Sequence, residues 1–270
     1  MSFPHKIGFM KPKGLGFCEQ YQAVYNEFTN KPAAADAVIQ NANILAIVAG
    51  GRYIKSERHR EFSVHTNDAG EAQLDWIDPA VNPPVTNVNG CAWDAYNGFT
   101  GQYAGGKYIN LNFNPTVDGT IIGQNNICLI WGVGNDLAEN YMDIGACDGT
   151  QYLAAYCRTA GGNANWRCNS SGSNNTVNAN AIKHYAMSRN NSANFDSYLN
   201  LVKTNITRTS TGLVSKTLYA CGHNNNDSAI ASNKQLRYAT IGSHLAEGEV
   251  QSAMTDEETY LDNYGTGLIT

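Results

Sequence analysis

Residues 127–168 read ICLIWGVGNDLAENYMDIGACDGTQYLAAYCRTAGGNANWRC, and this stretch decides the fold. Its apolar runs are short, and turn-forming pairs such as Asp148-Gly149 and Gly161-Gly162 separate them. Asp, Asn and Gly tolerate the positive φ angles of tight turns, and runs of about four to eight residues have the length of strands. The stretch therefore predicts successive antiparallel strands joined by short turns.

The same pattern extends outward, from about residue 88 to residue 242. Further short apolar or alternating runs lie at 108–113, 182–188, 195–201, 217–221, 229–230 and 235–241. About ten strands at this spacing are typical of a sandwich or barrel and not of β-α-β units. We therefore expect a mainly β protein built as an antiparallel β-sandwich.

One helix is expected before the strands, at residues 34–49. Pro32 suits the approach to a first turn, and Gly50-Gly51 supplies a C-terminal stop. An apolar stripe for packing is predicted at Ala34, Val38, Ala42, Leu45, Val48 and Ala49.

A second helix is expected after the strands, at residues 246–264. Its apolar face is predicted at Val250, Met254, Leu261 and Tyr264, and Gly265 ends it. The acidic run Asp256-Glu257-Glu258 is interpreted as solvated surface of this helix.

Charge and cysteine content exclude several classes of function. The chain has 270 residues and a net charge of −5, without a Lys/Arg stripe, so nucleic-acid binding is not expected. No signal-peptide stretch and no run of ~20 apolar residues is present, so we expect a protein without membrane insertion. The seven cysteines form no Cys-x-x-Cys pair, which favours small buried side chains in a reducing compartment over a structural metal.

Composition divides the chain into three regions. Residues 1–30 are predicted to be an N-terminal arm, because the first 20 mix prolines, glycines and isolated apolar residues; a floppy terminus is the equal alternative. Residues 31–87 are expected to hold the first helix and short strands that precede the sandwich, and residues 88–270 the sandwich and the C-terminal helix. The Pro-rich stretch 79–90 is the candidate boundary.

The segment LRYATIGSHLAEGEVQSAMTDEETYL, residues 236–261, resembles the end of concanavalin A-like (laminin G-like) jelly-roll domains of phage structural proteins. A last strand there delivers a Gly and then a Leu before an acidic helix, here Gly242, Leu245 and Glu247. Four upstream segments resemble the same group, namely VAGGRYIK (48–55), HTNDAGEAQLDWIDP (65–79), NGFTGQYAGGKYINLNFNP (97–115) and YMDIGACDGTQYL (141–153).

This resemblance covers about residues 30–265 and implies an antiparallel jelly roll of the concanavalin A type. It also implies a non-enzymatic virion protein, in a capsid decoration, tail or fibre, assembled in the host cytoplasm. The partners would be other virion proteins and, since virion positions are symmetric, further copies of this chain. A fold alone does not specify an activity, so function has to be sought in the site residues.

Catalytic constellations are missing from the sequence. A glycoside hydrolase needs two carboxylates across a cleft, and no strand carries the alternating carboxylates that would supply them. Asp136, Glu139 and Asp143 are weak candidates for Ca²⁺ ligands, with ordinary turn and surface acids the favoured interpretation. His184 is interpreted as a strand histidine with satisfied hydrogen bonds rather than a ligand contact. No other cofactor is expected.

Glycan binding has a stronger basis, because sugar sites combine an aromatic face with amide side chains. The candidate aromatic residues are Trp93, Tyr96, Tyr103, Trp131, Tyr152 and Trp166. Trp166 is the leading candidate, with Asn163, Asn165, Asn169 and Asn224 as polar partners, although a Trp in a sandwich core is the commoner arrangement.

Three hypotheses remain open at this point. The first is a phage virion protein attached through its arm, and the second is a free carbohydrate- or receptor-binding module that recognises a host surface glycan. The third is a divergent glycoside hydrolase, which needs two carboxylates lining one cleft.

Overall fold

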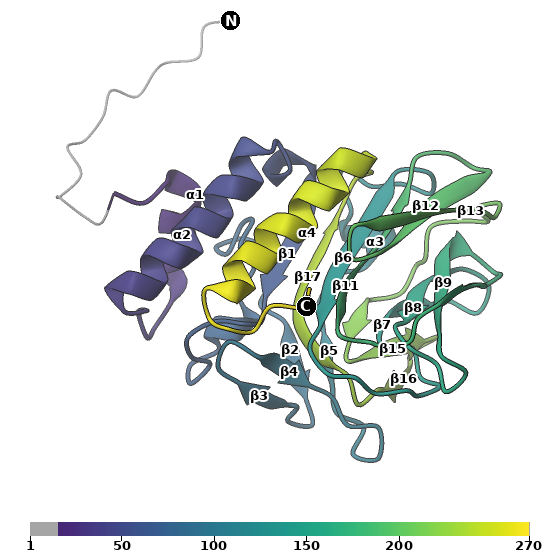
Figure 1. Ribbon diagram of the computed structural model, residues 1–270, viewed down its shortest axis with the longest axis horizontal. Coiled ribbons are helices and arrows are strands. Elements are labelled where there is room, and N and C mark those ends of the chain that lie inside the picture. Colours follow the sequence, from purple (N-terminus) through teal and green to yellow (C-terminus); the bar gives the residue numbers. More distant parts are fainter. Residues whose placement is uncertain (1–15, 270) are drawn as a thin grey trace, which may run out of the picture.

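The computed structural model describes residues 16–269, in which two facing β-sheets carry a layer of helices on one side (Figure 1). The helices are α1 (Glu19–Glu27), α2 (Ala34–Ala49), α3 (Pro115–Asp118) and α4 (Glu247–Asp262), with single 3-10 turns at Tyr53–Lys55 and Glu71–Gln73. The predicted mainly β, antiparallel sandwich of the jelly-roll class with a helix near each end is confirmed.

The first sheet has the order β13-β12-β11-β6-β17-β4-β3, with β1 also paired to β17. Its strands are β1 (Ser56–Glu61), β3 (Ala92–Asp94), β4 (Gly98–Thr100), β6 (Ile127–Val133), β11 (Lys183–Arg189), β12 (Asn194–Leu199), β13 (Val202–Thr207) and β17 (Gln235–Gly242).

The second sheet has the order β10-β9-β8-β7-β14-β5-β2, and β15 joins it through a parallel pairing with β7. Its strands are β2 (Thr86–Val88), β5 (Tyr108–Asn110), β7 (Ile144–Cys147), β8 (Tyr152–Tyr156), β9 (Asn163–Ser170), β10 (Asn174–Val177), β14 (Tyr219–Ala220), β15 (Gly222–Asn225) and β16 (Ser228–Ala231).

The main core lies between the two sheets. Trp131 of β6 and Trp166 of β9 are fully buried there, and the Tyr185 ring of β11 stacks on Trp131 at 5.4 Å between ring centroids. Burial of large aromatic surface at about 25 cal/mol per Å² makes this cluster a main source of stability.

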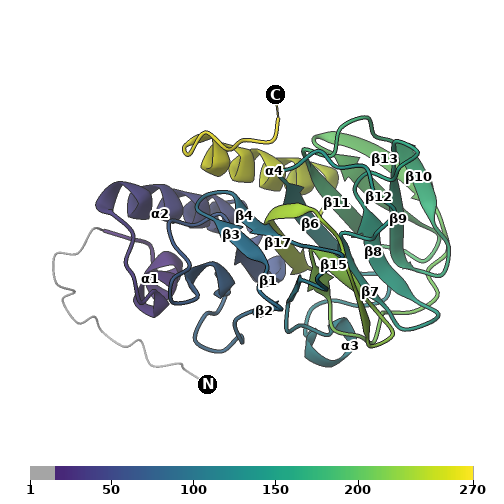
Figure 2. The same ribbon diagram turned by 90° about the horizontal axis from the view of Figure 1, so that it is seen from below.

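Helices α2 and α4 cover the outer face of the first sheet, which is the face turned away from the second sheet (Figure 2). A second apolar cluster joins α4 to this face, with Val250 and Met254 of the helix packed among Ile130, Ala186 and Tyr238 of the strands. The apolar face predicted for the C-terminal helix is therefore confirmed at Val250, Met254 and Leu261, all fully buried.

The predicted stripe on the N-terminal helix was on the wrong face. The bounds of α2 match the prediction, but Val38 and Leu45 are 55% and 45% exposed, whereas Gln40 and Asn43 are buried. The reason is hydrogen bonding: Gln40 Oε1 accepts a bond of 2.7 Å from the buried Tyr21 hydroxyl of α1, which satisfies a polar group inside.

The acidic run on α4 was also misinterpreted as solvated surface. Glu257 and Glu258 are 3% and 8% exposed and face the first sheet. Glu258 accepts a hydrogen bond of 2.8 Å from His184 Nε2, and Asn43 of α2 approaches Glu257. Buried partners on strands and on α2 are long-range features, which helical periodicity does not reveal.

The N-terminal third of the chain differs from the predicted division into an arm and a preceding segment. Of the predicted arm 1–30, residues 1–15 lie outside the described residues, and residues 19–27 form the helix α1, which was not predicted. Residues 31–87, expected to precede the sandwich, contribute β1 to the first sheet and β2 to the second. Because β1 pairs with β17, the first and the last of the described strands lie side by side in one sheet.

We predict that Gly242→Ala destabilises the fold. An added Cβ would lie 2.1 Å from the backbone oxygen of Lys55, where β17 passes β1, so the strands would have to separate. The expected loss is about 1–3 kcal/mol in the free energy of unfolding, measured by urea denaturation.

Gly248→Ala in α4 is the matched control, because nothing lies within 4 Å of its added Cβ. A Gly-to-Ala change in a helix should leave stability unchanged or raise it by up to about 1 kcal/mol. Equal stability of the two variants would contradict the close approach at Gly242.

Candidate functional site

A pocket of about 500 Å³ is hollowed into the outer face of the second sheet. Strands β8, β9 and β15, the hairpin partner β16 and five residues from two loops form its walls. The aromatic and charged side chains that line it are Tyr103, Tyr141, Tyr152, Tyr156, Arg167 and His223. It lies on the sheet that α2 and α4 do not cover.

Strand alternation places these side chains on the open face. In β9, Ala164, Trp166 and Cys168 point into the core, so Arg167 between them points outward. In β8, Leu153 and Ala155 are core residues, and therefore Tyr152 and Tyr156 point outward beside Arg167. Ala154 lies between Tyr152 and Tyr156 on the same face of β8 and pairs with Arg167 of β9. Its methyl group is too small to fill the space between the two tyrosines.

Aromatic contacts fix the geometry of the pocket. The Tyr103 and Tyr141 rings stack at 3.9 Å between centroids with an interplanar angle of 17°, and Tyr103 is 47% exposed. The guanidinium carbon of Arg167 lies 4.2 Å from the centroid of the Tyr152 ring, a cation–π contact that orients the guanidinium plane. The pocket thus presents stacked rings at one side and a held cation at the other.

His223 supplies a buried polar group to the same pocket. It is 6% exposed, and its Nδ1 has no hydrogen-bond partner among the described residues. Burial, and then the nearby positive charge of Arg167, lower the pKa of His223 to about 4, so the imidazole is neutral at pH 7. A neutral ring with a free nitrogen can donate or accept one hydrogen bond to a ligand.

The leading sequence candidate, Trp166, does not lie on the surface. It is fully buried between the sheets, and its Nε1 donates a hydrogen bond of 3.1 Å to Thr176 Oγ1. A ring enclosed in the core cannot stack on a sugar, so the Trp166 prediction is corrected to a core residue. The alternation of β9 that buries Trp166 is what exposes its neighbour Arg167.

The predicted asparagine partners do not converge on one site. Asn169 and Asn224 are buried at 0% and 2% exposure and bind backbone oxygens of Gln124 and Thr217. Asn163 and Asn165 lie on the outer face of β9, where they bond to Gly161 and Asn175. None of the four lines the pocket.

Among the other aromatic candidates, Tyr103 and Tyr152 do line the pocket. Trp131 is buried in the core, Trp93 Nε1 donates a hydrogen bond to Phe62 O, and Tyr96 stacks on Tyr264. Arg167 and His223 were missed, because only the alternation of β9 and the pairing of β15 reveal that they face the tyrosines.

The three candidate Ca²⁺ ligands are engaged separately in the described structure. Asp136 Oδ1 binds Arg158 at 2.7 Å, and the Glu139 carboxylate binds Asn233. Asp143 is buried, accepts a hydrogen bond from the Cys157 backbone, and has its pKa raised by burial to about 7. Asp136 and Glu139 lie at or near the surface in the loop after β6, whereas Asp143 is buried just before β7 and is not the surface acid that was expected. His184 is satisfied, with bonds from its two nitrogens to Tyr238 and Glu258, as predicted.

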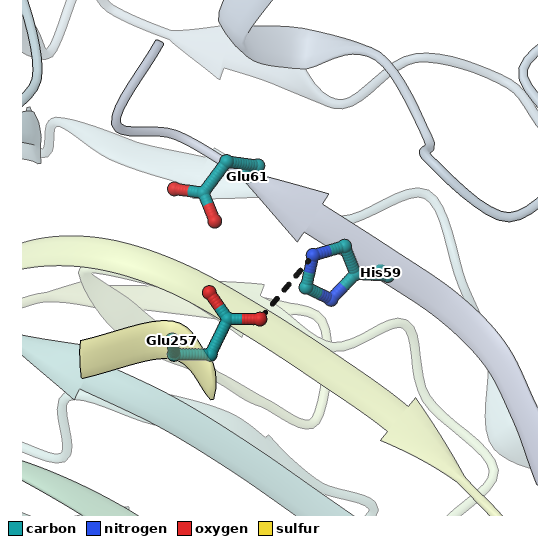
Figure 3. Close-up of side chains that lie close together, drawn as sticks. All are labelled: His59, Glu61 and Glu257. Atoms are coloured by element: carbon teal, nitrogen blue, oxygen red, sulfur yellow. Dashed lines mark ion pairs between the residues drawn. The ribbon is translucent and has the colours of Figure 1, made fainter. Parts of the chain in front are cut away.

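One group of described side chains has the composition of a metal site. His59 and Glu61 of β1 and Glu257 of α4 point toward one another, with ligand atoms within 4.8 Å (Figure 3). His59 Nε2 lies 3.7 Å from Glu257 Oε1, and His59 Nδ1 forms a hydrogen bond of 2.8 Å with Thr240. All three side chains are buried beneath α4.

Burial favours the neutral forms of all three side chains. Burial raises the pKa of Glu257 to about 7, and burial together with the negative charge of Glu257 raises the pKa of Glu61. Burial lowers the pKa of His59 to about 3, so this ring is neutral. The adjoining cavity measures about 20 Å³, which is room for a water molecule but not for a substrate.

All seven cysteines are free thiols, and six of them are buried. This arrangement matches the prediction of small buried side chains. Among residues 16–269, no helix is long and apolar enough to span a lipid bilayer.

Comparisons with known proteins reveal the fold but no family. No protein-family model and no curated protein matches this chain. Solved structures do match it, and they are β-sandwich domains of the lectin-like, jelly-roll type. This chain is a jelly-roll β-sandwich.

Three solved structures illustrate the likeness. The binding domain of botulinum neurotoxin serotype D matches with a TM-score of 0.55 and 14% identity over 78% of this chain and 53% of its own. Domain 4 of a GH43 extracellular arabinanase from Geobacillus stearothermophilus, in complex with arabinotriose, matches with a TM-score of 0.51 and 14% identity. The match covers 74% of this chain and 98% of the arabinanase domain. A Trypanosoma rangeli sialidase mutant with trans-sialidase activity matches with a TM-score of 0.51 and 7% identity. The match covers 83% of this chain and 39% of the sialidase.

This chain therefore spans about half or less of the toxin domain and the sialidase. At sequence identities of 7% to 14%, the similarity shows the fold alone.

We predict that Glu257→Gln changes the pH dependence of stability. Glu257 takes up its proton near pH 7 when folded but near 4.5 when unfolded, so the folded wild type binds more protons and loses stability as pH rises between these values. The uncharged Gln variant should lack this loss. At pH 8 it should be more stable than wild type by ~3 kcal/mol, from ~1.4 kcal/mol per pKa unit.

The measurement is urea denaturation at intervals from pH 4.5 to 8, compared with Glu247→Gln, which removes the same charge from an exposed position of α4. A pH-independent difference between wild type and Glu257→Gln would contradict the raised pKa of Glu257. A rise in Tm on adding Zn²⁺, absent in Glu257→Gln, would identify the cluster as a metal site instead.

Proposed function

We propose that this chain is a non-catalytic glycan-binding domain whose pocket of four tyrosines holds a saccharide. The pocket itself carries the proposal: Tyr103, Tyr141, Tyr152 and Tyr156 line a space of about 500 Å³ on an open sheet face. Sugar rings present apolar C–H faces that pack on aromatic rings, while their hydroxyl groups need hydrogen bonds.

The polar groups that such a ligand requires are in the same pocket. Asn140 and Asn225 line it and contribute amide donors and acceptors, and Arg167 and His223 add further nitrogens. The volume lies within the range of about 300–1,000 Å³ typical of small-molecule sites. The arabinanase domain solved with arabinotriose, and the toxin's binding domain, support a saccharide or a receptor as the ligand of a fold of this type.

The lining residues also support binding rather than hydrolysis. None of the described residues that line the pocket is Asp or Glu, whereas the common glycosidase mechanism needs a pair of carboxylates beside the bond that breaks. Of the buried carboxylates Glu61 and Glu257, only Glu257 borders a cavity, and its volume of about 20 Å³ admits no sugar.

A role in a phage particle is the second part of the proposal. It rests on the resemblance of residues 236–261 to the end of phage jelly-roll domains. In agreement with that pattern, Gly242 closes β17 against β1, and Leu245 packs in the cluster beneath α4. The domain would then be a symmetric capsid-decoration, tail or fibre component that presents the pocket to a host surface glycan, with other virion proteins as partners.

The glycan proposal is tested by Tyr103→Ala. This ring is 47% exposed, so its loss should leave the Tm nearly unchanged while removing a stacking surface. We expect glycan affinity, measured by isothermal titration calorimetry with an oligosaccharide selected on a glycan array, to fall about tenfold or more, or ~1.4 kcal/mol.

Trp166→Phe is the matched control for Tyr103→Ala. Trp166 lies in the core, so its truncation should lower the Tm but leave the affinity of the folded protein unchanged. Loss of binding in Trp166→Phe together with full binding in Tyr103→Ala would refute the pocket and restore the tryptophan site.

Attachment through the N-terminus is tested by deleting residues 1–15. The deletion stops before Phe17, which packs on Tyr21 of α1 at 4.8 Å, so the described fold should keep its Tm. The truncated chain is expected to be missing from purified particles on mass spectrometry. Incorporation at the wild-type level would show that the arm is not the attachment element.

A further inference from the structure

The pocket has an unusual charge for this protein. The whole chain has a net charge of −5, yet among residues 16–269 Arg167 is the only charged side chain that lines the pocket. Within residues 16–269, Arg167 forms no ion pair, and its buried Nε has no hydrogen-bond partner. Arg167 is half-buried, and an anionic group that enters the pocket would meet its charge without competition from a protein carboxylate among the described residues.

A second group without hydrogen bonds lies in the same wall. His223 is 6% exposed, its Nδ1 is buried without a partner, and its Nε2 forms no hydrogen bond among the described residues. Buried polar atoms are nearly always hydrogen-bonded in native proteins, so Nδ1 indicates an ordered water, and Nε2 is the ring nitrogen left for a ligand.

The shape of the Arg167 group favours one kind of anion. The Tyr152 ring lies 4.2 Å from the guanidinium carbon and holds the planar group against the sheet. A guanidinium presents parallel N–H donors that match the two oxygens of a carboxylate, and such bidentate bonds are the strong ones. Bonds of this kind involve charge on both partners. Tyr103 stacks on Tyr141 and is 47% exposed, so its outer face can pack against the sugar ring.

We propose that the pocket recognises an acidic saccharide, in which a sugar carboxylate is bound by Arg167 and His223 while the sugar ring packs on the tyrosines. The inference rests on the proposed glycan-binding function and names the chemical class of its ligand. It commits to a carboxylate carried on a sugar, as in a uronic or sialic acid.

The first experiment uses an array of paired oligosaccharides. Each pair holds an acidic member, such as trigalacturonic acid or a sialyl-lactose, and the same molecule with its carboxylates methyl-esterified. The wild-type protein should bind acidic members and lose about tenfold to hundredfold in affinity on esterification, the size of one charge-assisted hydrogen-bonded pair. The preference should weaken as salt is added from 50 mM to 500 mM.

The second experiment assigns the preference to one side chain. With the best-binding pair, Arg167→Gln should bind acid and ester about equally, and Arg167→Lys should retain only part of the preference, because it keeps the charge but not the fork. Lys203→Gln is the charge-matched control, since Lys203 lies on β13 of the first sheet beside Glu247. Its preference for the acid should equal that of wild type. Retained binding of the ester by Arg167→Gln shows that the variant is folded.

The outcomes separate the two proposals. Equal binding of acids and esters by wild-type protein overturns the acidic-ligand inference and leaves glycan binding standing. Failure to bind any member of either kind overturns both. A preference for the acid that survives in Arg167→Gln overturns the assignment to this pocket.

Discussion

A carboxylate buried between a strand, a helix and the end of the chain holds the helical layer on the first sheet. Glu258 of α4 accepts hydrogen bonds from His184 of β11 at 2.8 Å and from the Leu268 backbone at 2.7 Å. Burial alone would raise the pKa of Glu258, but these donors outweigh it and lower the pKa. With α4 fixed here, the outer face of the first sheet is covered, and the outer face of the second sheet remains for a ligand.

The adjacent Glu257 shows that nearby hydrogen-bond donors determine the direction in which the pKa of a buried acid shifts. Burial raises the pKa of Glu257, and the contacts with Glu61 and Asn43 only reduce this rise, whereas the donors around Glu258 outweigh its burial. Buried polar groups of this kind cost stability compared with apolar packing, but they restrict how a helix can sit on a sheet. We infer that α2 and α4 are positioned by these matched polar contacts, since the buried face of α2 is itself polar at Gln40 and Asn43.

Periodicity predicted the elements well and their faces less well. The bounds of α2 and most strands follow from local runs and turn residues, because these signals lie within a few residues of one another. The buried face of α2 and the burial of Glu257 depend on partners up to 214 residues away, such as the pair Asn43 and Glu257. The pocket is equally non-local: Tyr103 and Tyr152 were selected by residue type, whereas Arg167 and His223 needed the strand pairings.

The register of β9 links the core to the pocket. Trp166 is anchored between the sheets beside Trp131 and Tyr185, and the next residue, Arg167, is thereby forced to the outer face over Tyr152. A slip of one residue would exchange the two side chains, burying a charge and exposing a large ring, so the cost of any such slip is high. The tryptophan that resembles a ligand contact in the sequence therefore acts from the other side of the sheet. By fixing the register, it places the arginine over Tyr152 before any ligand arrives, and a group placed in advance loses less entropy on binding.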